Sequence, residues 1–426
     1  MVNLNKFRNA LIQKSPFYYG WTVIGSIWVV TFFSVTFATP SFSVLVGPIT
    51  DEFGWNRTLF AGAISVATII GAPAGIVIGR MLDRYGTRSM LTLATLAMGA
   101  SLILLALVQN LFMFYLAVFL GRALSGTVIM LGGTVAVANW FVLRRKPVLA
   151  VLLLANYVGI IVLPVSFVLV FGGSDWRQAL WILGIITTAS AIIPWLLIAA
   201  KRPEDVGLLP DGINHLTSDF KDNSEGLIEE NWTPTHAVRT RSFWFITLAT
   251  MAVMATMGSQ LHRLPFFLEN GLNPGITSLY VVCLVLGMSS GGFLVSILGR
   301  WVPDRLLLAA VVLAGALLLF LITAIPANKA VVLYAYGDGF VVGSTLTLMP
   351  TMLANYFGRR EVGAIRGLAH SLMMCANAAG AIIPSLVYDF WGGSYAPAFT
   401  GIGVCLVAGA VFAAMATKPK RLVITT

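Results

Sequence analysis

Twelve apolar runs divide this chain, and each is close to the roughly 20 residues that an α-helix needs to cross a bilayer. Inside lipid, backbone N–H and C=O groups must find partners within the protein, so runs of this length are stable only as helices. Charged residues make up 10% of the sequence, against about 25% in soluble domains. We therefore predict an all-α membrane protein. The expected spans are Tyr19–Val44, Leu59–Met81, Met90–Leu107, Phe112–Val137, Val148–Val170, Leu180–Ala199, Phe243–Leu261, Thr277–Leu298, Leu306–Ile325, Ala330–Leu353, Gly367–Val387 and Pro397–Ala416.

The sequence of the fourth span returns in the tenth. The fourth is followed by Asn-Trp-Phe at 139–141 and the tenth by Asn-Tyr-Phe at 355–357, a shift of 216 positions (355 − 139). Three further pairs of segments agree, with shifts of about 216 to 221. The duplication predicts two pseudo-symmetric bundles of six helices, residues 1–200 and 243–426, with a cytoplasmic linker and short interfacial helix at 201–242. The three further pairs are EFGWN with ENGLN, GRMLDR with GRWVPDR, and Pro164 with Pro384.

Applied to Arg122, the same shift leads to Asp338, so the duplication predicts opposite charges at equivalent depth in equivalent helices. An arginine at membrane depth costs at least about 2.5 kcal/mol on insertion scales, so it needs water, a partner or a bound anion. We expect Arg122 to bind an anion and Asp338 to take up a proton. Two other interpretations remain open: a permanent ion pair between them, or an arginine bonded to backbone carbonyls.

The positive charges fall mostly on one side of the predicted topology. Of the 27 Lys and Arg residues, 22 lie on the inner side and Arg122 lies within the membrane. The positive-inside rule then predicts cytoplasmic termini, with the first run retained as a signal anchor. Because the positive charges lie mostly in the inner loops, the net charge of +10 is explained by membrane topology and does not indicate nucleic-acid binding. The outer positive residues are Arg57, Arg177, Arg263 and Lys329.

Cysteine usage and the polar residues of the spans argue against other classes of protein. Cys283, Cys375 and Cys405 are an odd set within predicted spans, so neither a disulfide framework nor a metal site is expected. The spans contain no His/Asp, Cys/His or metal-ligand cluster, which disfavours a membrane enzyme or sensor. No cofactor is expected.

The second and third spans are joined by GRMLDRYGTR, residues 79–88. Its glycines permit a tight turn, and its aspartate can pair with arginines and a facing helix end. This segment resembles the signature of the major facilitator superfamily, and Arg122-Ala-Leu-Ser-Gly126 resembles that family's helix 4 motif. The resemblance implies the major facilitator fold and a conformational latch. The latch residues are Gly79, Asp83, Arg84, Gly86 and Arg88.

The loop from Arg202 to Gly212 resembles one common in monocarboxylate transporters and the oxalate/formate antiporter. Two features of that branch are missing here. Its monocarboxylate carriers have an arginine in helix 8 where this chain has Ser296, and the antiporter's helix 11 lysine aligns with Met373. Further likenesses to the branch are Tyr19-Gly20-Trp21, the segment from Phe53 to Thr58, Trp140-Phe141 before Arg144, and the segment from His262 to Pro265, expected to open an outer loop.

In this superfamily helices 1, 4, 7 and 10 line a central cavity, which implies a set of substrate-binding and coupling residues. The expected function is a secondary active transporter that moves a small organic anion, a monocarboxylate, with protons by alternating access. We expect a monomer in the inner (cytoplasmic) membrane, in contact with lipid and not with nucleic acid. The alternative is a proton-driven exporter of amphipathic or cationic compounds, with Asp338 as the cation site. The expected site residues are Arg122, Asp338, His262, Gln260, Thr39, Tyr334, Asn156, Tyr157, His370 and Asn377.

Overall fold

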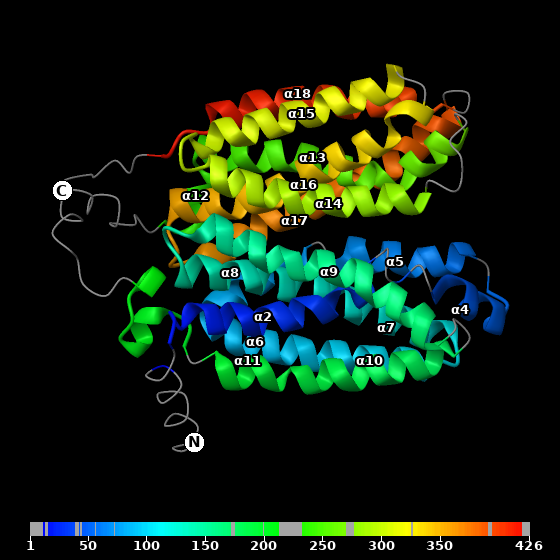
Figure 1. Cartoon of the computed structure of the whole chain (residues 1–426), viewed down its shortest axis with the longest axis horizontal. Coiled ribbons are helices and arrows are strands. Elements are labelled where there is room, and N and C mark those ends of the chain that lie inside the picture. Colours follow the sequence, from blue (N-terminus) through cyan, green and yellow to red (C-terminus); the bar gives the residue numbers. More distant parts are fainter. Residues whose placement is uncertain are drawn as a thin grey trace. The chain divides into compact units, whose positions relative to one another are not determined.

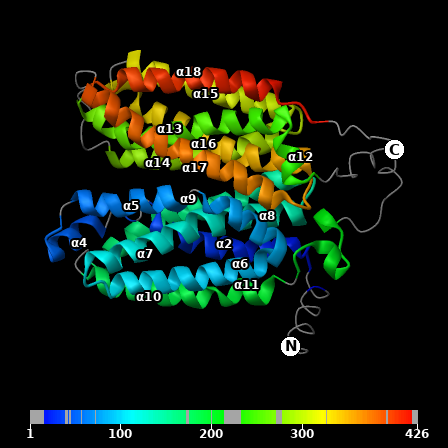
Figure 2. The ribbon, with the colours of Figure 1, turned by 180° about the vertical axis from the view of Figure 1, so that it is seen from behind.

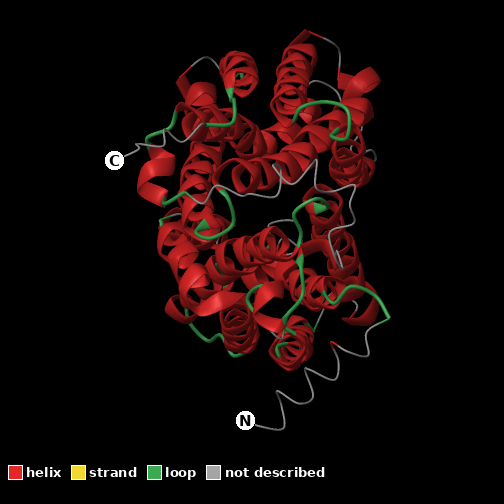
Figure 3. Ribbon diagram, turned by 90° about the vertical axis from the view of Figure 1, so that its left-hand side faces the viewer, coloured by secondary structure: helices red, strands yellow, loops and turns green. Residues whose placement is uncertain are grey.

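The secondary structure of the described residues is helical, without a strand (Figure 3). Thr39 and the central part of the linker lie outside the described residues, as does most of the segment before the first helix. The chain is seen here as a computed structural model. It describes residues 12, 16–38, 42, 45–55, 57–71, 73–171, 175–198, 200–212, 232–269, 277–324, 327–390 and 394–419.

Eleven helical segments of the described residues are long and apolar enough to cross a membrane. One of them, α6 (Ala74–Ala106), contains parts of two spans, because Gly86 breaks its helical backbone with φ 79°. The second span is formed by α5 (Arg57–Gly71) and the part of α6 before Gly86, and the third span by the part after it. The prediction of an all-α protein with twelve transmembrane helices is therefore confirmed.

Contacts between Cα atoms divide the chain into two compact units. The first contains residues 1–228 and 362–368, and the second contains residues 229–361 and 369–426. Within the first unit, α6 runs beside α10 (Figure 2), and α2 packs against α9. Its helices besides α5 and α6 are α2 (Gly20–Ser34), α4 (Val46–Phe53), α7 (Leu111–Ala123), α8 (Met130–Trp140), α9 (Arg145–Phe171), α10 (Trp176–Ser190) and α11 (Ile192–Leu197), and a 3₁₀ turn, η1 (Val35–Phe37), and a π-helical turn, η3 (Leu124–Ile129), follow α2 and α7.

Within the second unit, α15 lies beside α18 (Figure 1), and α14 packs closely on α16. Glycines make the second packing possible: a Cβ at Gly339 would collide with the carbonyl oxygen of Leu284, and one at Gly343 with that of Met288. Small residues of this kind let helix backbones approach within membranes. The helices are α12 (Pro234–Val238), α13 (Arg241–Glu269), α14 (Thr277–Leu298), α15 (Asp304–Ala324), α16 (Ala327–Phe357), α17 (Val362–Phe390, which begins in the first unit) and α18 (Ala396–Met415).

The helix boundaries repeat the shift seen in the sequence. Helix α7 begins at Leu111 and α16 at Ala327, which differ by 216 positions (327 − 111). Arg122 and Asp338 are each eleven residues beyond these starts (122 − 111 and 338 − 327). The two charges therefore occupy equivalent positions along equivalent helices.

Helix α13 extends beyond its predicted end. The sequence predicted a span ending at Leu261 and an outer loop containing Arg263, but the helix continues through Pro265 to Glu269. The prediction of an outer position for Arg263 was wrong, because its side chain is fully buried within the helical bundle. A proline is tolerated inside spanning helices, since neighbouring groups can satisfy the backbone carbonyl that it leaves free. The segment from His262 to Pro265 therefore continues the helix and does not open an outer loop.

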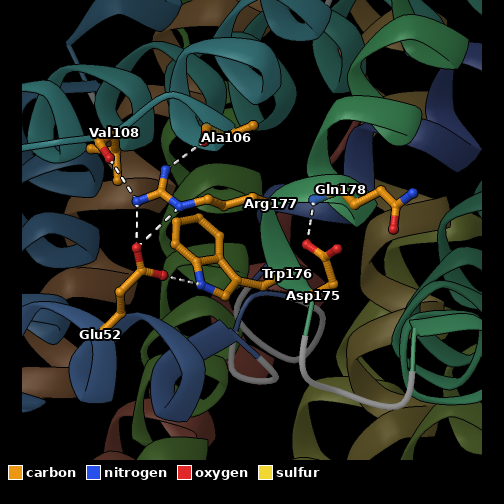
Figure 4. A network of polar contacts seen from close by, with 7 residues as sticks. All are labelled: Glu52, Ala106, Val108, Asp175, Trp176, Arg177 and Gln178. Atoms are coloured by element: carbon orange, nitrogen blue, oxygen red, sulfur yellow. Dashed lines mark hydrogen bonds and ion pairs between the residues drawn. The ribbon is translucent and has the colours of Figure 1, made fainter.

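A network of polar contacts joins α4, α6 and α10 in the first unit (Figure 4). Arg177, near the start of α10, forms an ion pair with Glu52 of α4, with 2.7 Å between Nη2 and Oε1. Arg177 also donates to the carbonyl oxygens of Ala106 and Val108 at the end of α6, where a cation complements the helix dipole. Hydrogen bonds from Arg177, aided by that from Trp176, hold the pKa of the Glu52 carboxyl below its usual value.

The loop from Arg202 to Gly212 supports the start of α9. Its Asp211 adopts a left-handed backbone with φ 59°. The carboxylate accepts hydrogen bonds from the backbone N–H groups of Val142, Leu143 and Arg144 at 2.8 to 3.2 Å. A carboxylate satisfies the donors of such a turn in the same way as a helix N-cap.

Candidate functional site

Arg122 lies in the last turn of α7, with its side chain half-buried inside a spanning segment. Its Nη1 donates to the carbonyl oxygen of Phe37 at 2.7 Å, at the end of the first transmembrane helix. Gly121 makes this approach possible, since a Cβ there would collide with the Phe37 ring. The π-helical turn η3 begins two residues later, and such turns occur frequently at functional sites.

Acidic side chains that could neutralise Arg122 are scarce in the spans of its own unit. The spanning helices α2 and α5 to α11 contain one acidic residue, Asp83, and its carboxylate bonds to backbone amides elsewhere in the unit. The Phe37 carbonyl is a neutral acceptor, so this hydrogen bond orients the guanidinium without cancelling its charge. Arg122 therefore places a guanidinium, hydrogen-bonded to a neutral carbonyl, inside the first unit.

Helix α9 contributes the other two expected residues of this unit. Asn156 is half-buried, and Tyr157 is 3% exposed. The hydroxyl of Tyr157 has no hydrogen-bond partner among the described residues. Leaving a buried polar group unbonded costs about 1–3 kcal/mol, so this hydroxyl is a candidate for bonding to a transported molecule.

In the second unit, Asp338 of α16 forms an ion pair with Arg263 of α13. Nη1 of Arg263 lies 2.5 Å from Oδ2 of Asp338, and both side chains are almost completely buried. Gln260, one turn before Arg263, donates from Nε2 to the same oxygen at 2.7 Å. The other edge of the guanidinium is held by its own helix, because Nη2 donates to the carbonyl of Thr256 and to Ser259.

This pairing corrects the expected partner of Asp338. From the sequence, Arg122 was a possible partner, because it has the opposite charge at an equivalent position. The structure instead neutralises Asp338 with Arg263, from a different helix of the same unit. The available signal was the apolar sequence LPFF after Arg263, which continues the helix pattern beyond Leu261 and brings the arginine into the span.

Aromatic residues enclose the ion pair. The guanidinium carbon of Arg263 lies 5.4 Å from the ring centre of Tyr334, an arrangement that permits cation–π attraction. Phe267, one turn after Arg263, contacts Tyr334 at 5.6 Å and Tyr280 of α14 at 6.1 Å between ring centres. Of these residues, Tyr334, which is 1% exposed, was expected from the sequence. Tyr280 was not expected, because the sequence contains no comparable pattern around it.

Two of the remaining expected residues form hydrogen bonds between helices. His262 is 9% exposed, and its Nε2 lies 2.7 Å from the carbonyl oxygen of Ala381 in α17. Asn377 of α17 donates to the carbonyl of Met254 at 3.2 Å. His370 is half-buried in α17, and Thr39 lies outside the described residues.

The glycine-rich segment at 79–88 contacts the start of α17, whose residues 362–368 belong to the first unit. The carboxylate of Asp83 accepts from the backbone N–H groups of Gly363 at 3.0 Å and Ala364 at 2.7 Å. These are unsatisfied donors of a helix N-terminus, where negative charge is favoured. Gly79 has no side chain to obstruct the contact, because a Cβ there would collide with the carbonyl oxygen of Gly363.

The two arginines of this segment have aromatic neighbours. Arg84 is exposed and lies over the ring of Tyr85, at 5.4 Å from its centre. Arg88 lies 5.1 Å from the ring centre of Trp195 in α11. Gly86, the fifth residue expected in the latch, provides the positive φ that ends one span and starts the next.

A cavity of about 20 Å³ lies within the first unit, next to η1, α9 and α10. This volume is enough for one water molecule and not for an organic substrate. Among the described residues, no group of three or more His, Cys, Asp or Glu side chains is arranged to hold a metal ion. The residues that line the cavity are Thr36, Leu45, Leu163, Pro164, Phe167, Leu180 and Leu183.

Solved structures resemble this fold across nearly its whole length. The human organic anion transporter MFSD10 (TETRAN) is similar with a TM-score of 0.65 and 16% identity, over 92% of this chain and 99% of the other. The transporter FucP, solved in the outward conformation, also has a TM-score of 0.65, with 18% identity over 93% of this chain and 99% of the other. At these identities the similarity shows the fold alone.

Comparisons of sequence agree. MFS transporter asaE of Aspergillus flavus is 22% identical over 344 residues, which are 79% of this chain and 73% of that protein. An uncharacterized MFS-type transporter, YcxA of Bacillus subtilis, is 25% identical over 41% of this chain and 45% of its own length. The family model named Major Facilitator Superfamily matches residues 27–342. The chain therefore belongs to the Major Facilitator Superfamily and is a multi-pass membrane transporter, not an enzyme.

Proposed function

We propose that this transporter moves a small organic anion, a monocarboxylate, together with protons across the inner (cytoplasmic) membrane by alternating access. In this proposal the protein is a monomer with both termini in the cytoplasm, as the positive charges of its inner loops favour. The observation that supports an anionic substrate best is the guanidinium of Arg122, which lies inside a spanning helix and is oriented by the neutral carbonyl of Phe37.

The charge balance of the two units supports Arg122 as the anion-binding group. In the second unit, Arg263 and Asp338 neutralise each other. In the spans of the first unit, the single acidic side chain bonds to backbone amides. A carboxylate that docks on Arg122 gains a charge-assisted hydrogen bond and offsets the cost of holding a cation at membrane depth.

Asp338 is the proposed proton carrier. Its carboxylate is buried, and its charge is matched by Arg263 and stabilised by Gln260. Protonation would leave Arg263 without a counter-ion in a low-dielectric environment, which is strongly unfavourable unless a negative charge arrives with the proton. This linkage favours movement of a proton together with an anion.

The same ion pair argues against the alternative function. An exporter of cationic compounds would use Asp338 as its cation site, with Tyr334 and Tyr336 as walls. Arg263 already occupies that carboxylate, and Tyr334 packs against the arginine. A cationic substrate would have to displace a buried guanidinium, which costs more than occupying an open carboxylate.

The segment at 79–88 is proposed to act as a conformational latch. Its aspartate bonds to the first amides of α17, and close glycine packing permits that contact. We propose that this contact stabilises one of the alternating conformations and is released in the other, with Arg84 and Arg88 adding electrostatic support. Hydrogen bonds to charged groups contribute about 1.5–3 kcal/mol each, enough to shift a two-state equilibrium more than tenfold.

The substrate class is tested by uptake into proteoliposomes that contain the purified full chain. Labelled lactate, pyruvate and formate are compared with a lipophilic cation, at inside pH 7.5 and outside pH 5.5 or 7.5. We expect uptake of at least one carboxylate, stimulated by the inward proton gradient, and none of the cation. Uptake of the cation alone would replace the proposal with the exporter function.

Three variants test the proposed roles of Arg122 in anion binding and of Asp338 in proton coupling. Arg122→Gln removes the charge and is expected to abolish carboxylate uptake, whereas Arg122→Lys retains part of it. Asp338→Asn is expected to abolish the response to the proton gradient while exchange of carboxylate continues. The control is Thr134→Val, whose buried hydroxyl bonds only to carbonyls of its own helix. If Asp338→Asn keeps the full gradient response, its proposed role is excluded.

A further inference from the structure

Three buried hydrogen-bond donors around Arg263 lack an acceptor among the described residues. They are Nε of Arg263 on α13, the hydroxyl of Tyr280 on α14 and the hydroxyl of Tyr334 on α16. The three side chains are 0%, 5% and 1% exposed. Buried polar groups in native proteins are bonded in the great majority of cases, so a cluster of three open donors requires an explanation.

The spacing of residues along α13 and α16 brings these donors together. Phe267 follows Arg263 by one turn, and its ring contacts both tyrosine rings. Tyr334 precedes Asp338 by one turn of α16, so the residue that bonds Arg263 and the residue that stacks on it share one helix face. Both tyrosine hydroxyl oxygens also lie within reach of a hydrogen bond from Arg263, which leaves each hydroxyl hydrogen to be donated elsewhere, and both tyrosines interact electrostatically with Arg263 and Asp338.

We propose that Arg263, Tyr280 and Tyr334 form a binding site for a small monovalent anion the size of a halide or formate. The guanidinium and the two phenol groups can all direct hydrogen atoms at one acceptor, and arginine has no acceptor of its own. The site is separate from Arg122. It deepens the proposed function, since it rests on Asp338 as the proton carrier and names the ligand whose binding is linked to that proton.

The charge count links this anion to a proton. Arg263 and Asp338 already sum to zero, so an added anion would leave one uncompensated negative charge in a buried site. Such a charge is costly at low dielectric. Protonation of Asp338 restores neutrality, with Arg263 then bonding the anion. The anion therefore binds more tightly at low pH.

The other groups around Asp338 do not change this count. From α13 it faces Arg263 and the uncharged Gln260, from α14 Tyr280, and on its own helix Tyr334. Thus none of these described neighbours of Asp338 is acidic. The charged residues of α15, Asp304 and Arg305, lie at the start of that helix. They are near Tyr356, at the C-terminal end of α16 and 18 positions beyond Asp338 (356 − 338).

The test is a thermal unfolding measurement on the purified full chain in detergent, with sodium chloride, bromide or formate against sodium gluconate at equal ionic strength. At pH 5.5 we expect each small anion to raise the melting temperature by several degrees above the gluconate value, and at pH 8 we expect a much smaller rise. Tyr280→Phe and Tyr334→Phe should each weaken the apparent affinity about tenfold, the effect of one lost hydrogen bond. Asp338→Asn should give the same anion response at both pH values.

Two controls separate this site from other effects. Tyr336→Phe removes a hydroxyl from a residue that is 39% exposed, two positions from Tyr334 and on a different face of α16, and it should leave the anion response unchanged. Arg122→Gln should abolish carboxylate uptake while the anion response persists. If Arg122→Gln leaves uptake intact, the proposed substrate site fails while the anion site stands.

Two outcomes would overturn the anion site. One is an equal melting temperature in all four salts at both pH values, which would mean that the open donors bond to water. The other is an anion response that survives in both Tyr280→Phe and Tyr334→Phe, which would assign it to another part of the protein.

Discussion

Arg263 and Asp338 form a buried ion pair between α13 and α16, with Nη1 2.5 Å from Oδ2. Neither side chain could be held at this depth alone, because an unpaired charge in a low-dielectric interior is far more costly than a paired one. The pair joins the two helices and sets the charge of the interior of the second unit to zero. The roles proposed for Asp338 in proton transfer and for Arg263 in anion binding both depend on it.

Removing one partner of this pair is expected to destabilise the protein more than removing both. Arg263→Met leaves a buried carboxylate without a counter-ion, at a cost of about 3–5 kcal/mol. The double variant Arg263→Met with Asp338→Leu removes both charges and should recover most of that loss. Free energies of unfolding from denaturant titration in mixed micelles provide the measurement. Thr347→Val, which loses a hydroxyl bonded to its own helix at Gly343, is the matched buried control. Additive losses in the double variant would mean that the pair is not energetically coupled.

The contact of Asp83 with α17 is expected to control the rate of transport. Asp83→Ala removes two charge-assisted hydrogen bonds, worth about 1.5–3 kcal/mol each, whereas Asp83→Asn keeps one acceptor oxygen. Uptake should therefore fall more in the alanine variant. Gly79→Ala should reproduce the alanine effect, because its methyl group collides with the Gly363 carbonyl. The control is Gly25→Ala, where a Cβ meets no atom within 4 Å. Unchanged uptake in both Asp83→Ala and Gly79→Ala would exclude the latch.

The Glu52 to Arg177 network predicts how stability depends on pH. The folded pKa of Glu52 is lowered below its reference value of 4.5, chiefly by the hydrogen bonds from Arg177. A lowered pKa means that the stabilisation is complete above pH 4.5 and is lost as the pH falls through the folded pKa. Both side chains are about a third or more exposed, so the contribution is small, below about 1 kcal/mol.

The melting temperature of the natural protein and of Glu52→Gln, recorded between pH 3 and pH 7, measures this contribution. We expect a constant difference above about pH 5 that decreases below pH 4.5. Asp51→Asn changes the exposed neighbouring carboxylate and serves as the control. A difference that grows on acidification would contradict the assigned direction of the pKa change.

The buried hydroxyl of Tyr157 is expected to bind the transported anion. Tyr157→Phe removes a group with no partner among the described residues, so stability should be unchanged or slightly higher. The KM for carboxylate uptake should rise by about 3- to 10-fold, the equivalent of one hydrogen bond of about 0.5–1.5 kcal/mol.

Tyr115→Phe is the matched control for this measurement. The hydroxyl of Tyr115 donates to the carbonyl of Leu59 at 3.0 Å, so its removal should lower stability and leave KM unchanged. An unchanged KM in Tyr157→Phe would show that its hydroxyl does not contact the substrate.

Much of the fold was predictable because the membrane limits the alternatives. Apolar runs near 20 residues must become helices in lipid, and a duplicated sequence must build a duplicated structure. The shift of 216 positions found in the sequence reappears in the starts of α7 and α16. The glycines and aspartate at 79–88 also predicted their contact, because a carboxylate near a helix N-terminus is favoured wherever the backbones can approach.

The candidate site was predicted only in part. Arg122, Asp338, Gln260 and Tyr334 were recognised as polar or aromatic residues within spans, and the structure joins the last three around Arg263. Arg263 itself was misplaced, because the segment from His262 to Pro265 was expected to open an outer loop, whereas the helix continues to Glu269. Within the bilayer an apolar segment stays helical even where it contains a proline, because an unwound segment would expose unbonded backbone groups to lipid.

The sequence by itself determined that this chain is a duplicated bundle of membrane-spanning helices, with Arg122 and Asp338 at equivalent positions in equivalent helices. The depth of a residue along a span follows from counting, since each helical residue rises by about 1.5 Å. The choice of partner for each charge was decided by the tertiary structure alone. Which face of α13 meets which face of α16 depends on packing over whole helices, and that packing joins Asp338 to Arg263.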